Sequence, residues 1–215
     1  MTSCQCQCQG IEQIFDSEMA SRELRSYQRN GPGRTTQLLV DALRAEGVAG
    51  ASLLDIGGGV GAIPLGLLAS GLRSATDVDA SGAYLAVARA EAQRRGYDGQ
   101  VTYHHGNFVE LAHTLESADI VTLDRVICCY HDMPALVKES TAKARRLYGL
   151  VYPRDDWWVR LGITAENTFL RVRRQLYRAF VHPVRAVDTI VRDAGFVQRF
   201  FHRGAIWQVV VYARH

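Results

Sequence analysis

The stretch Leu53-Leu54-Asp55-Ile56-Gly57-Gly58-Gly59-Val60-Gly61-Ala62 decides the fold of this 215-residue chain. Apolar residues lead to an acidic one, glycines follow, and a helical pattern then begins. This order is typical of a buried strand that turns sharply into a helix. Glycine adopts positive φ angles and lets a ligand approach the backbone, and the start of a helix offers unpaired N–H groups. The stretch therefore predicts a turn that holds a cofactor.

One class of cofactor that uses such a turn is a dinucleotide. Its pattern is G-x-G-x-x-G/A, with an acidic residue about 20 positions further on. Gly57, Gly59 and Ala62 satisfy that pattern loosely, and Asp79 supplies the acid. A nicotinamide-dependent oxidoreductase is therefore one functional hypothesis.

The second class is indicated by an acidic residue followed by G-x-G-x-G, here Asp55, Gly57, Gly59 and Gly61. This pattern resembles the first motif of the class I S-adenosylmethionine (SAM) methyltransferases. A carboxylate at the end of the strand would repel a pyrophosphate, whereas it suits a ligand that carries an ammonium and a sulfonium. The strand also begins only near residue 51, while dinucleotide domains commonly open with it. These observations favour SAM as the cofactor.

The resemblance implies further cofactor contacts at the ends of later strands. Asp79 closes the second strand, where the family commonly places a carboxylate that accepts hydrogen bonds from the ribose hydroxyls. Asn107 and Phe108 follow the third strand, where the family has a polar side chain that reads the adenine amino group and an apolar neighbour beside the ring. Asp124 ends the fourth strand and is expected beside the cofactor, because ligands gather outside the carboxyl ends of parallel strands.

The residues after Asp124 are expected to face the methyl acceptor. Cys128 and Cys129 stand there as packing groups or as part of a substrate pocket, since free cysteine is commonly a small buried hydrophobe. His131 is the candidate general base, because imidazole titrates near neutral pH. An exposed histidine at the start of a helix is the alternative.

A narrower resemblance links the chain to the magnesium-protoporphyrin O-methyltransferases. Three segments follow the order of that family: 29–36, 123–127 and 177–183 with its continuation to 195–196. That family continues its fourth strand into Ile-His-Tyr-Pro, whereas this chain continues into Ile127-Cys128-Cys129-Tyr130. No catalytic residue is therefore carried over.

Strands and helices alternate after residue 51, which predicts an α/β fold with a Rossmann-like parallel sheet and helices on both faces. A helical cap over 11–50 precedes this SAM-binding domain at 51–215, and an antiparallel strand ends it. The expected strands span 52–55, 74–79, 101–105, 119–124, 146–152, 196–203 and 206–214. The expected helices of the domain span 62–70, 81–95, 135–144 and 183–194.

An insertion at about 153–181 is the most individual segment. Its helical face carries Trp157, Leu161, Ala165, Thr168, Val172 and Leu176, and arginines follow. Three interpretations stay open. The segment is a lid over the acceptor, a helix on a membrane surface, or a helix packed on the sheet with a solvated basic face.

Composition restricts the class of protein. The net charge of +3 is too small to indicate a nucleic-acid partner, and no stretch reaches the roughly 20 apolar residues of a membrane span. The first residues lack the pattern of a secretory signal, so a cytoplasmic location is expected. Cys4, Cys6 and Cys8 fall in a tail over 1–10 that is expected to be flexible, with a metal or redox role as the alternative.

The sequence thus predicts a SAM-dependent methyltransferase that acts on a small-molecule acceptor. The alternatives are an NAD-dependent oxidoreductase and a non-catalytic SAM- or metal-binding protein. Peripheral contact with a membrane is compatible with the insertion, and the sequence makes no prediction of oligomeric state.

Overall fold

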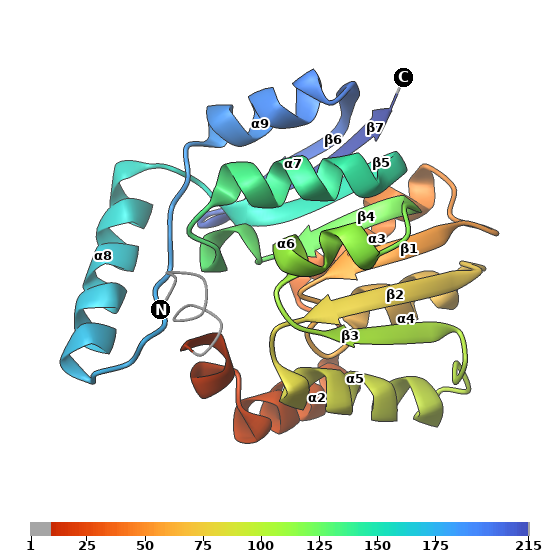
Figure 1. Ribbon diagram of the computed structural model, residues 1–215, viewed down its shortest axis with the longest axis horizontal. Coiled ribbons are helices and arrows are strands. Elements are labelled where there is room, and N and C mark those ends of the chain that lie inside the picture. Colours follow the sequence, from red (N-terminus) through yellow and green to blue (C-terminus); the bar gives the residue numbers. More distant parts are fainter. Residues whose placement is uncertain (1–9, 215) are drawn as a thin grey trace.

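The computed structural model describes residues 10–214, which form one layered α/β fold (Figure 1). Cys4, Cys6 and Cys8 lie outside the described residues. Seven strands form one sheet in the order β3-β2-β1-β4-β5-β7-β6. Strand β7 is antiparallel to both of its neighbours, and the pairs from β3 to β5 are parallel. The predicted Rossmann-like fold with an antiparallel C-terminal strand is therefore confirmed.

The elements follow the predicted alternation closely. The strands are β1 Ser52–Ile56, β2 Ser74–Asp79, β3 Val101–His105, β4 Ala118–Asp124, β5 Ala144–Pro153, β6 Phe196–Arg203 and β7 Trp207–Arg214. The helices are α2 Ser17–Asn30, α3 Arg34–Ala45, α4 Ala62–Leu68, α5 Gly82–Arg94, α6 Phe108–Leu111, α7 Met133–Lys143, α8 Trp157–Val172 and α9 Val184–Asp193.

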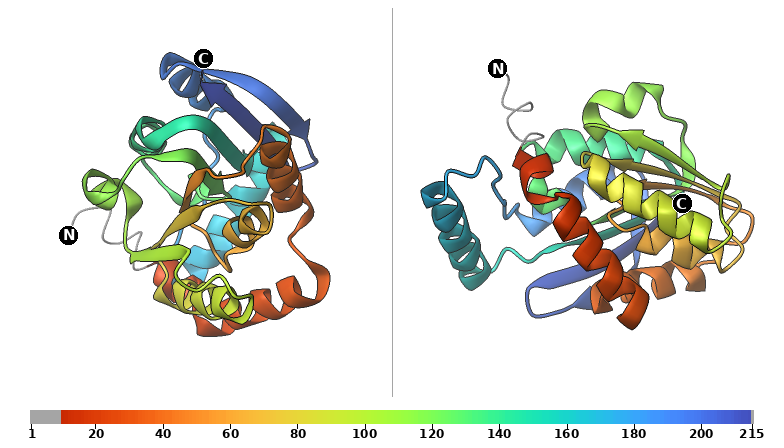
Figure 2. Two further views of the ribbon diagram at one scale, coloured as in Figure 1. Left: turned by 90° about the vertical axis from the view of Figure 1, so that its right-hand side faces the viewer. Right: turned by 90° about the horizontal axis from the view of Figure 1, so that it is seen from below.

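Each face of the sheet has its own apolar core because successive strand residues point to opposite sides. Leu53 packs with α3 and α4 on one face. Leu54 packs with α6, α7 and α9 on the other face (Figure 2). Strand β7 alternates in the same way, with Val209 on the first side and Val210 on the second. The central strands are therefore covered on both sides, as a parallel sheet requires.

The N-terminal cap lies along one side of the sheet and reaches its carboxyl edge. Residues 10–14 are helical, and the chain breaks before α2, whose first turn is capped by Asp16. Tyr27 of α2 packs against Leu65 and Ala92, so this helix rests on α4 and α5. The break at residues 15–16 leaves the first helical turn free to lean over the ends of the strands (Figure 2).

The insertion differs from one of its three interpretations. The apolar face predicted for it is exposed along its whole length, and only Val159 of α8 is buried. Packing of that face on the sheet is therefore wrong. The physical reason is that both faces of the sheet are already covered by other helices, so α8 extends beyond the carboxyl edge instead.

The described residues contain no helix that is long and apolar enough to cross a membrane.

The contact between α3 and the sheet depends on a glycine. A Cβ atom at Gly149 of β5 would lie 2.8 Å from Leu39 Cδ1 and 3.3 Å from Thr122 Cγ2. We expect Gly149→Ala to lower the free energy of unfolding by about 1–3 kcal/mol, because overpacking displaces α3. Gly162→Ala in α8 is the matched control, since nothing lies within 4 Å of its Cβ position. It should raise stability by about 0.5–1 kcal/mol. Urea unfolding measures both, and equal effects would contradict this packing.

Candidate cofactor and acceptor site

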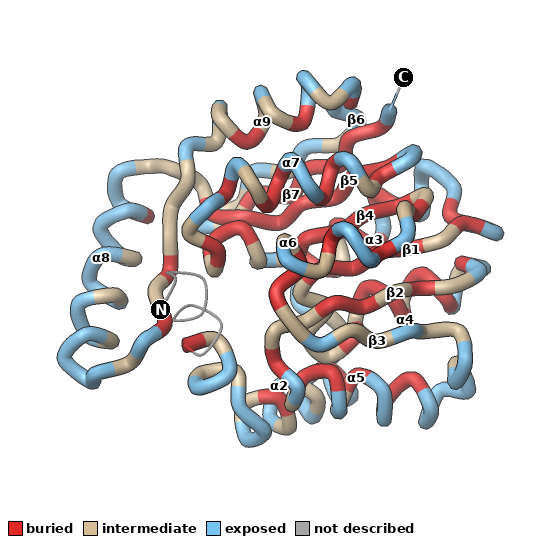
Figure 3. The backbone as a smooth tube through the Cα atoms, in the orientation of Figure 1, coloured by how far each residue is buried: buried red, intermediate tan, exposed pale blue. Residues whose placement is uncertain are grey.

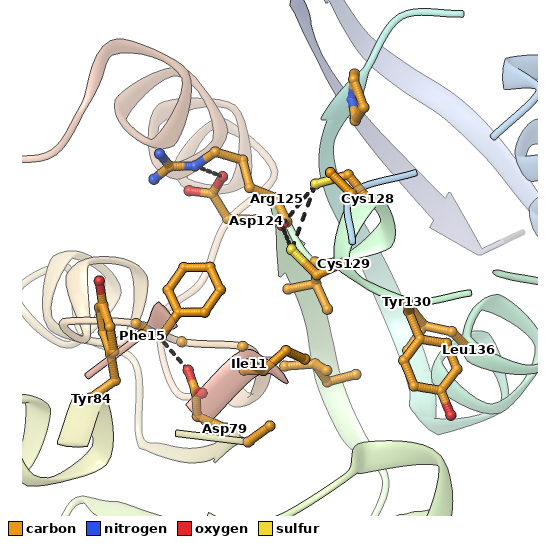
Figure 4. A pocket seen from close by; sticks show the side chains of 18 of the residues that line it. Ile11, Phe15, Asp79, Tyr84, Asp124, Arg125, Cys128, Cys129, Tyr130 and Leu136 are labelled. Atoms are coloured by element: carbon orange, nitrogen blue, oxygen red, sulfur yellow. Dashed lines mark hydrogen bonds and ion pairs between the residues drawn. The ribbon is translucent and has the colours of Figure 1, made fainter. Parts of the chain in front are cut away.

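A cavity of about 580 Å³ opens at the carboxyl edge of the sheet. Its floor is the glycine turn after β1 together with the ends of β2 and β4. The N-terminal residues and α8 line the remaining walls. Figure 4 shows labelled side chains from the N-terminal segment, from the end of β2 and from the end of β4 around one space. Its position agrees with the rule that ligands bind outside the carboxyl ends of parallel strands.

The glycine turn has the backbone that the sequence predicts. Gly57, Gly59 and Gly61 have φ angles of 68°, 58° and 79°, which disfavour any residue with a Cβ atom. Gly57 and Gly59 line the cavity. Gly61 precedes α4 and packs against Ala88 of α5, where it shapes the turn from behind.

Asp55 is buried at the end of β1 beneath this turn. Its Oδ1 accepts a hydrogen bond of 2.6 Å from Thr122 Oγ1, while its Oδ2 accepts none from any residue that the structure describes. The pKa of Asp55 is raised to about 8, mainly by burial, with a smaller rise from the charges of Asp124 and Asp79 and an opposing effect of the hydrogen bond from Thr122. A carboxylate in this state costs free energy until a cation arrives.

Two more carboxylates stand beside Asp55 on β2. Asp77 pairs with Asp55 in the register of the sheet, and burial followed by repulsion from Asp55 raises its pKa. Asp79 lies at the cavity and accepts hydrogen bonds from Gly59 N at 3.1 Å and Ser81 N at 2.8 Å. Burial also raises the pKa of Asp79. Its oxygens keep lone pairs that can accept further hydrogen bonds, as a ribose contact needs.

This set of carboxyl groups beneath a glycine turn fits SAM. The cofactor carries an ammonium and a sulfonium, and it would enter a cavity whose floor gathers buried carboxyl groups that a bound cation favours in their ionised form. The unpaired Oδ2 of Asp55 and the glycine turn provide an acceptor and an open backbone at the same place. The same carboxylates would repel the negative charges of a pyrophosphate.

Asp124 and Arg125 occupy the end of β4. Thr36 Oγ1 donates to Asp124 Oδ2 at 2.5 Å, and Arg125 Nε lies 3.1 Å from Asp124 Oδ1. Arg125 has a φ of 61°, an uncommon conformation for a residue with a side chain. Both side chains line the cavity, and Figure 4 shows them on the side that carries the cysteines.

Asn107 and Phe108 lie where the sequence predicts them, at the wall below β3. Asn107 caps α6, because its Oδ1 accepts from Val109 N at 3.1 Å. Its Nδ2 donates to the Tyr130 hydroxyl at 3.3 Å. Phe108 is buried in the core and lines one wall of the cavity. These two hydrogen bonds fix the orientation of the Asn107 amide at the cavity wall.

Cys128 and Cys129 both line the cavity, on a short 3-10 turn after β4. Their Sγ atoms are 3.8 Å apart, and Cys129 Sγ lies 3.1 Å from the Tyr177 hydroxyl. The hydrogen bonds from Cys128 and from Tyr177 lower the pKa of the Cys129 thiol, against the effect of burial. Of the two predicted roles, the pocket role agrees with this position.

His131 is not among the described residues that line the cavity. The 3-10 turn over Ile127–Cys129 directs the thiols and then Tyr130 toward the cavity. The His131 ring instead packs on the Tyr130 ring at 5.3 Å, next to the start of α7. The role of His131 as a general base stays a prediction of the sequence.

The cavity is covered by two segments that are far apart in sequence. Phe15 from the N-terminal segment makes edge contacts at 5.8 Å with Tyr84 of α5 and with Tyr177. From the other side α8 lines the cavity with residues from successive turns of the helix. These are Trp158, Val159, Gly162, Ile163 and Glu166. Residues of the N-terminal segment and of α8 thus both line the cavity, a position that agrees with the lid interpretation of the insertion.

Several cavity residues escaped the sequence analysis. Glu23 and Tyr84 belong to none of the predicted motifs, although Tyr84 lies in the first turn of α5 after β2. Arg125 was noticed only for its place in the porphyrin-family segment 123–127. Tyr177 was noticed only for its place in the porphyrin-family segment. Nothing in the local sequence indicates that it returns to Cys129.

Comparisons with known proteins concern the domain and the fold of the chain. Residues 54–145 match a family model described as a methyltransferase domain. Magnesium protoporphyrin IX methyltransferase from Synechocystis PCC 6803 with bound SAH (the demethylated product of SAM) aligns over 97% of this chain and 100% of its own, with a TM-score of 0.75 and 22% identity. The form of that protein with bound SAM aligns over 97% of both chains, with a TM-score of 0.70 and 18% identity.

A putative sarcosine dimethylglycine methyltransferase from Galdieria sulphuraria aligns over 84% of this chain and 85% of its own, with a TM-score of 0.66 and 14% identity. No curated protein matches the chain. The domain match over 54–145 and the shared fold support the prediction of a class I methyltransferase fold, and the aligned Synechocystis structures hold SAM or SAH. At these identities the likeness to individual proteins shows the fold.

The raised pKa of Asp55 has a consequence for stability. The folded-state pKa of about 8 exceeds the ordinary value of 3.8. The contribution of Asp55 to the free energy of unfolding is therefore fully present below about pH 4 and is lost as pH rises through 8. Asp55→Asn removes this titration and keeps the acceptor for Thr122. We expect the ligand-free variant to melt about 3 °C above the wild type near pH 9, about 1 kcal/mol for a domain of this size. Thermal melts at several pH values test this, with Asp98→Asn as control, and parallel melting curves for all three proteins would contradict it.

Proposed function

We propose that this enzyme transfers the methyl group of SAM to a small, largely apolar acceptor. One observation carries the proposal: beyond the carboxylates of the floor, the same cavity is walled by aromatic and aliphatic side chains from α8, the N-terminal segment and residue 177. An enclosed apolar wall with few polar groups is typical of a small-molecule site.

The charges in the cavity support a small molecule over a nucleic acid. Arg125 is the only basic side chain among its described lining residues. The acidic ones are Glu23, Asp55, Asp79, Asp124 and Glu166. A polyanion needs a basic surface and would be repelled by this lining.

The cofactor contacts proposed from the motif use the floor. Asp79 accepts hydrogen bonds from the ribose hydroxyls while it holds the Gly59 turn. Asp55 and the turn at Gly57 and Gly59 neutralise and enclose the positively charged end. Asn107 and Phe108 bind the adenine, and Asp124 closes the side toward the acceptor. When bound, SAM supplies an electrophilic methyl group, so these residues mainly fix its orientation.

The acceptor end suits a carboxylic acid carried on an apolar ring system. Arg125 is the cation available to orient a carboxylate, and a carboxylate attacks without losing a proton, so it needs no general base. The aromatic side chains of Phe15, Tyr84 and Tyr177 can pack on a ring. Because the Synechocystis protein is a magnesium protoporphyrin IX methyltransferase, that molecule is the first acceptor to test.

Calorimetric titration with SAH tests the cofactor part of the proposal. Asp79→Asn keeps one acceptor for the backbone but lowers the charge that faces the ribose. We expect it to weaken SAH binding at least tenfold, about the value of a hydrogen bond to a charged group. Asp98→Asn, in an exposed loop, should bind like the wild type. Tight binding of NAD with no response to SAH would overturn the proposal.

The acceptor part is tested separately with methyl-labelled SAM. Label should pass to magnesium protoporphyrin or to another apolar carboxylic acid, and Arg125→Gln should raise the KM for that acceptor more than it lowers SAH affinity. Transfer only to amines or to RNA would contradict the acceptor class and leave the cofactor site intact.

A further inference from the structure

The outer face of α8 is an apolar surface with no partner in the described structure. Eight large hydrophobic side chains are exposed among the described residues, and six of them lie within 157–176. Trp157, Leu161, Phe169 and Val172 are 76%, 62%, 56% and 78% exposed. They are four, eight and three residues apart in turn, spacings that place them on one side of the helix. Figure 3 shows α8 as a largely exposed helix at the margin of the fold.

Basic residues accompany this face. Arg160 and Arg171 are about three turns apart, so they share one edge of the apolar stripe, and both are exposed. Arg173 and Arg174 follow the helix directly, with the Arg173 guanidinium 4.6 Å from the Phe169 ring. Arg171, Arg173 and Arg174 form no ion pair with a described residue. The acidic residue of α8, Glu166, faces the cavity instead.

The helix is held firmly although its outer face is exposed. Asn167 exchanges two hydrogen bonds with the backbone of Ala179, at 2.8 and 2.9 Å. Phe180 N in turn donates to Cys128 O at 2.7 Å, beside the cavity. The exposed stripe is therefore a fixed surface, because its supporting segment is bonded to the end of β4.

We propose that the outer face of α8 docks on an anionic lipid surface. An apolar stripe with tryptophan and phenylalanine, edged by arginines, is the composition of a helix that lies in the membrane interface. The apolar side chains would enter the acyl boundary, and the arginines would remain among anionic headgroups.

A second copy of this chain fits the surface less well. In a symmetric dimer the same patch meets itself, so the arginines of one copy need acidic residues near the other helix. Asp155 and Asp156 are the candidates, but they are engaged within their own chain. Asp156 pairs with Arg154 at 2.6 Å and with Arg203 at 3.4 Å, and Asp155 Oδ2 accepts from Val184 N.

Docking on this face would place the cavity next to the lipid. The opposite side of the same helix forms the cavity wall through Trp158, Val159 and Ile163. One helix thus separates the acceptor space from the proposed membrane surface. The proposal concerns the surface alone and does not depend on the identity of the acceptor.

Flotation of the whole protein with vesicles tests the proposal. Vesicles of phosphatidylcholine with about one third phosphatidylglycerol should bind the protein, whereas vesicles of pure phosphatidylcholine should bind it at least fivefold less. Leu161→Gln combined with Phe169→Gln should lower binding to the anionic vesicles at least tenfold. Phe201→Gln, which changes an equally exposed ring on β6, should leave binding unchanged.

The contribution of charge is tested by Arg171→Glu, which should lower binding to the anionic vesicles at least fivefold. Arg185→Glu on α9 is the control, because it changes the net charge equally but lies away from α8, and it should lower binding less. SAH titration of every variant verifies that the protein is folded. The proposal would be overturned if the protein bound neutral and anionic vesicles equally, or if every variant bound like the wild type. It would also be overturned if the protein bound neither kind of vesicle at low salt. A stable dimer in sedimentation that the Leu161/Phe169 variant dissociates would overturn it as well, because the patch then belongs to a second copy.

Discussion

The structure depends on an electrostatic arrangement that is unfavourable without a ligand. The parallel register places Asp55 beside Asp77, with Asp79 two residues further along β2. Burial raises the pKa values of all three, and repulsion by neighbouring carboxylates adds to the rise at Asp55 and Asp77. A folded protein tolerates such a cluster where a cationic ligand compensates for it, because the free energy lost in the free state is recovered on binding. The glycine turn above the cluster leaves the space through which that ligand makes contact.

The cover of the cavity follows from the same geometry. Both faces of the sheet are already packed, so the N-terminal segment and α8 have only the carboxyl edge to occupy. Phe15 of the N-terminal segment contacts Tyr177 in the segment that follows α8, which joins the two covers, and it also contacts Tyr84 of α5. This exclusion of water strengthens the electrostatics of the floor, and it leaves α8 with one face on the cavity and one face outward.

Most of the fold could be predicted from the sequence because its signals are local. The glycine turn, the alternation of strands and helices, and Pro183 before α9 each fix an element by short-range chemistry. That Asp55, Asp79 and Asp124 line the cavity was predictable for the same reason, since each stands at or next to the end of a strand. The short helix α6 was missed because a single turn carries no periodicity.

What could not be predicted depends on contacts between distant segments. The stripe on α8 has the spacing of a buried helix, and only the fully covered sheet explains why it faces outward. Tyr177 meets Cys129 through the return of segment 173–183, which no local pattern encodes. His131 was chosen for its chemistry, but the 3-10 turn at Ile127–Cys129 aims the thiols at the cavity and not the imidazole.

The number of protons released when SAM binds tests the central claim most directly. Because the pKa of Asp55 is about 8 in the ligand-free protein, its carboxyl is mostly protonated at about pH 7, and a bound cation should expel that proton. Calorimetry in buffers of different ionisation enthalpy should show the release of roughly one proton in the wild type and almost none in Asp55→Asn. Binding without proton release, or with uptake, would contradict the view that the buried carboxylates bind the cofactor by its positive charge.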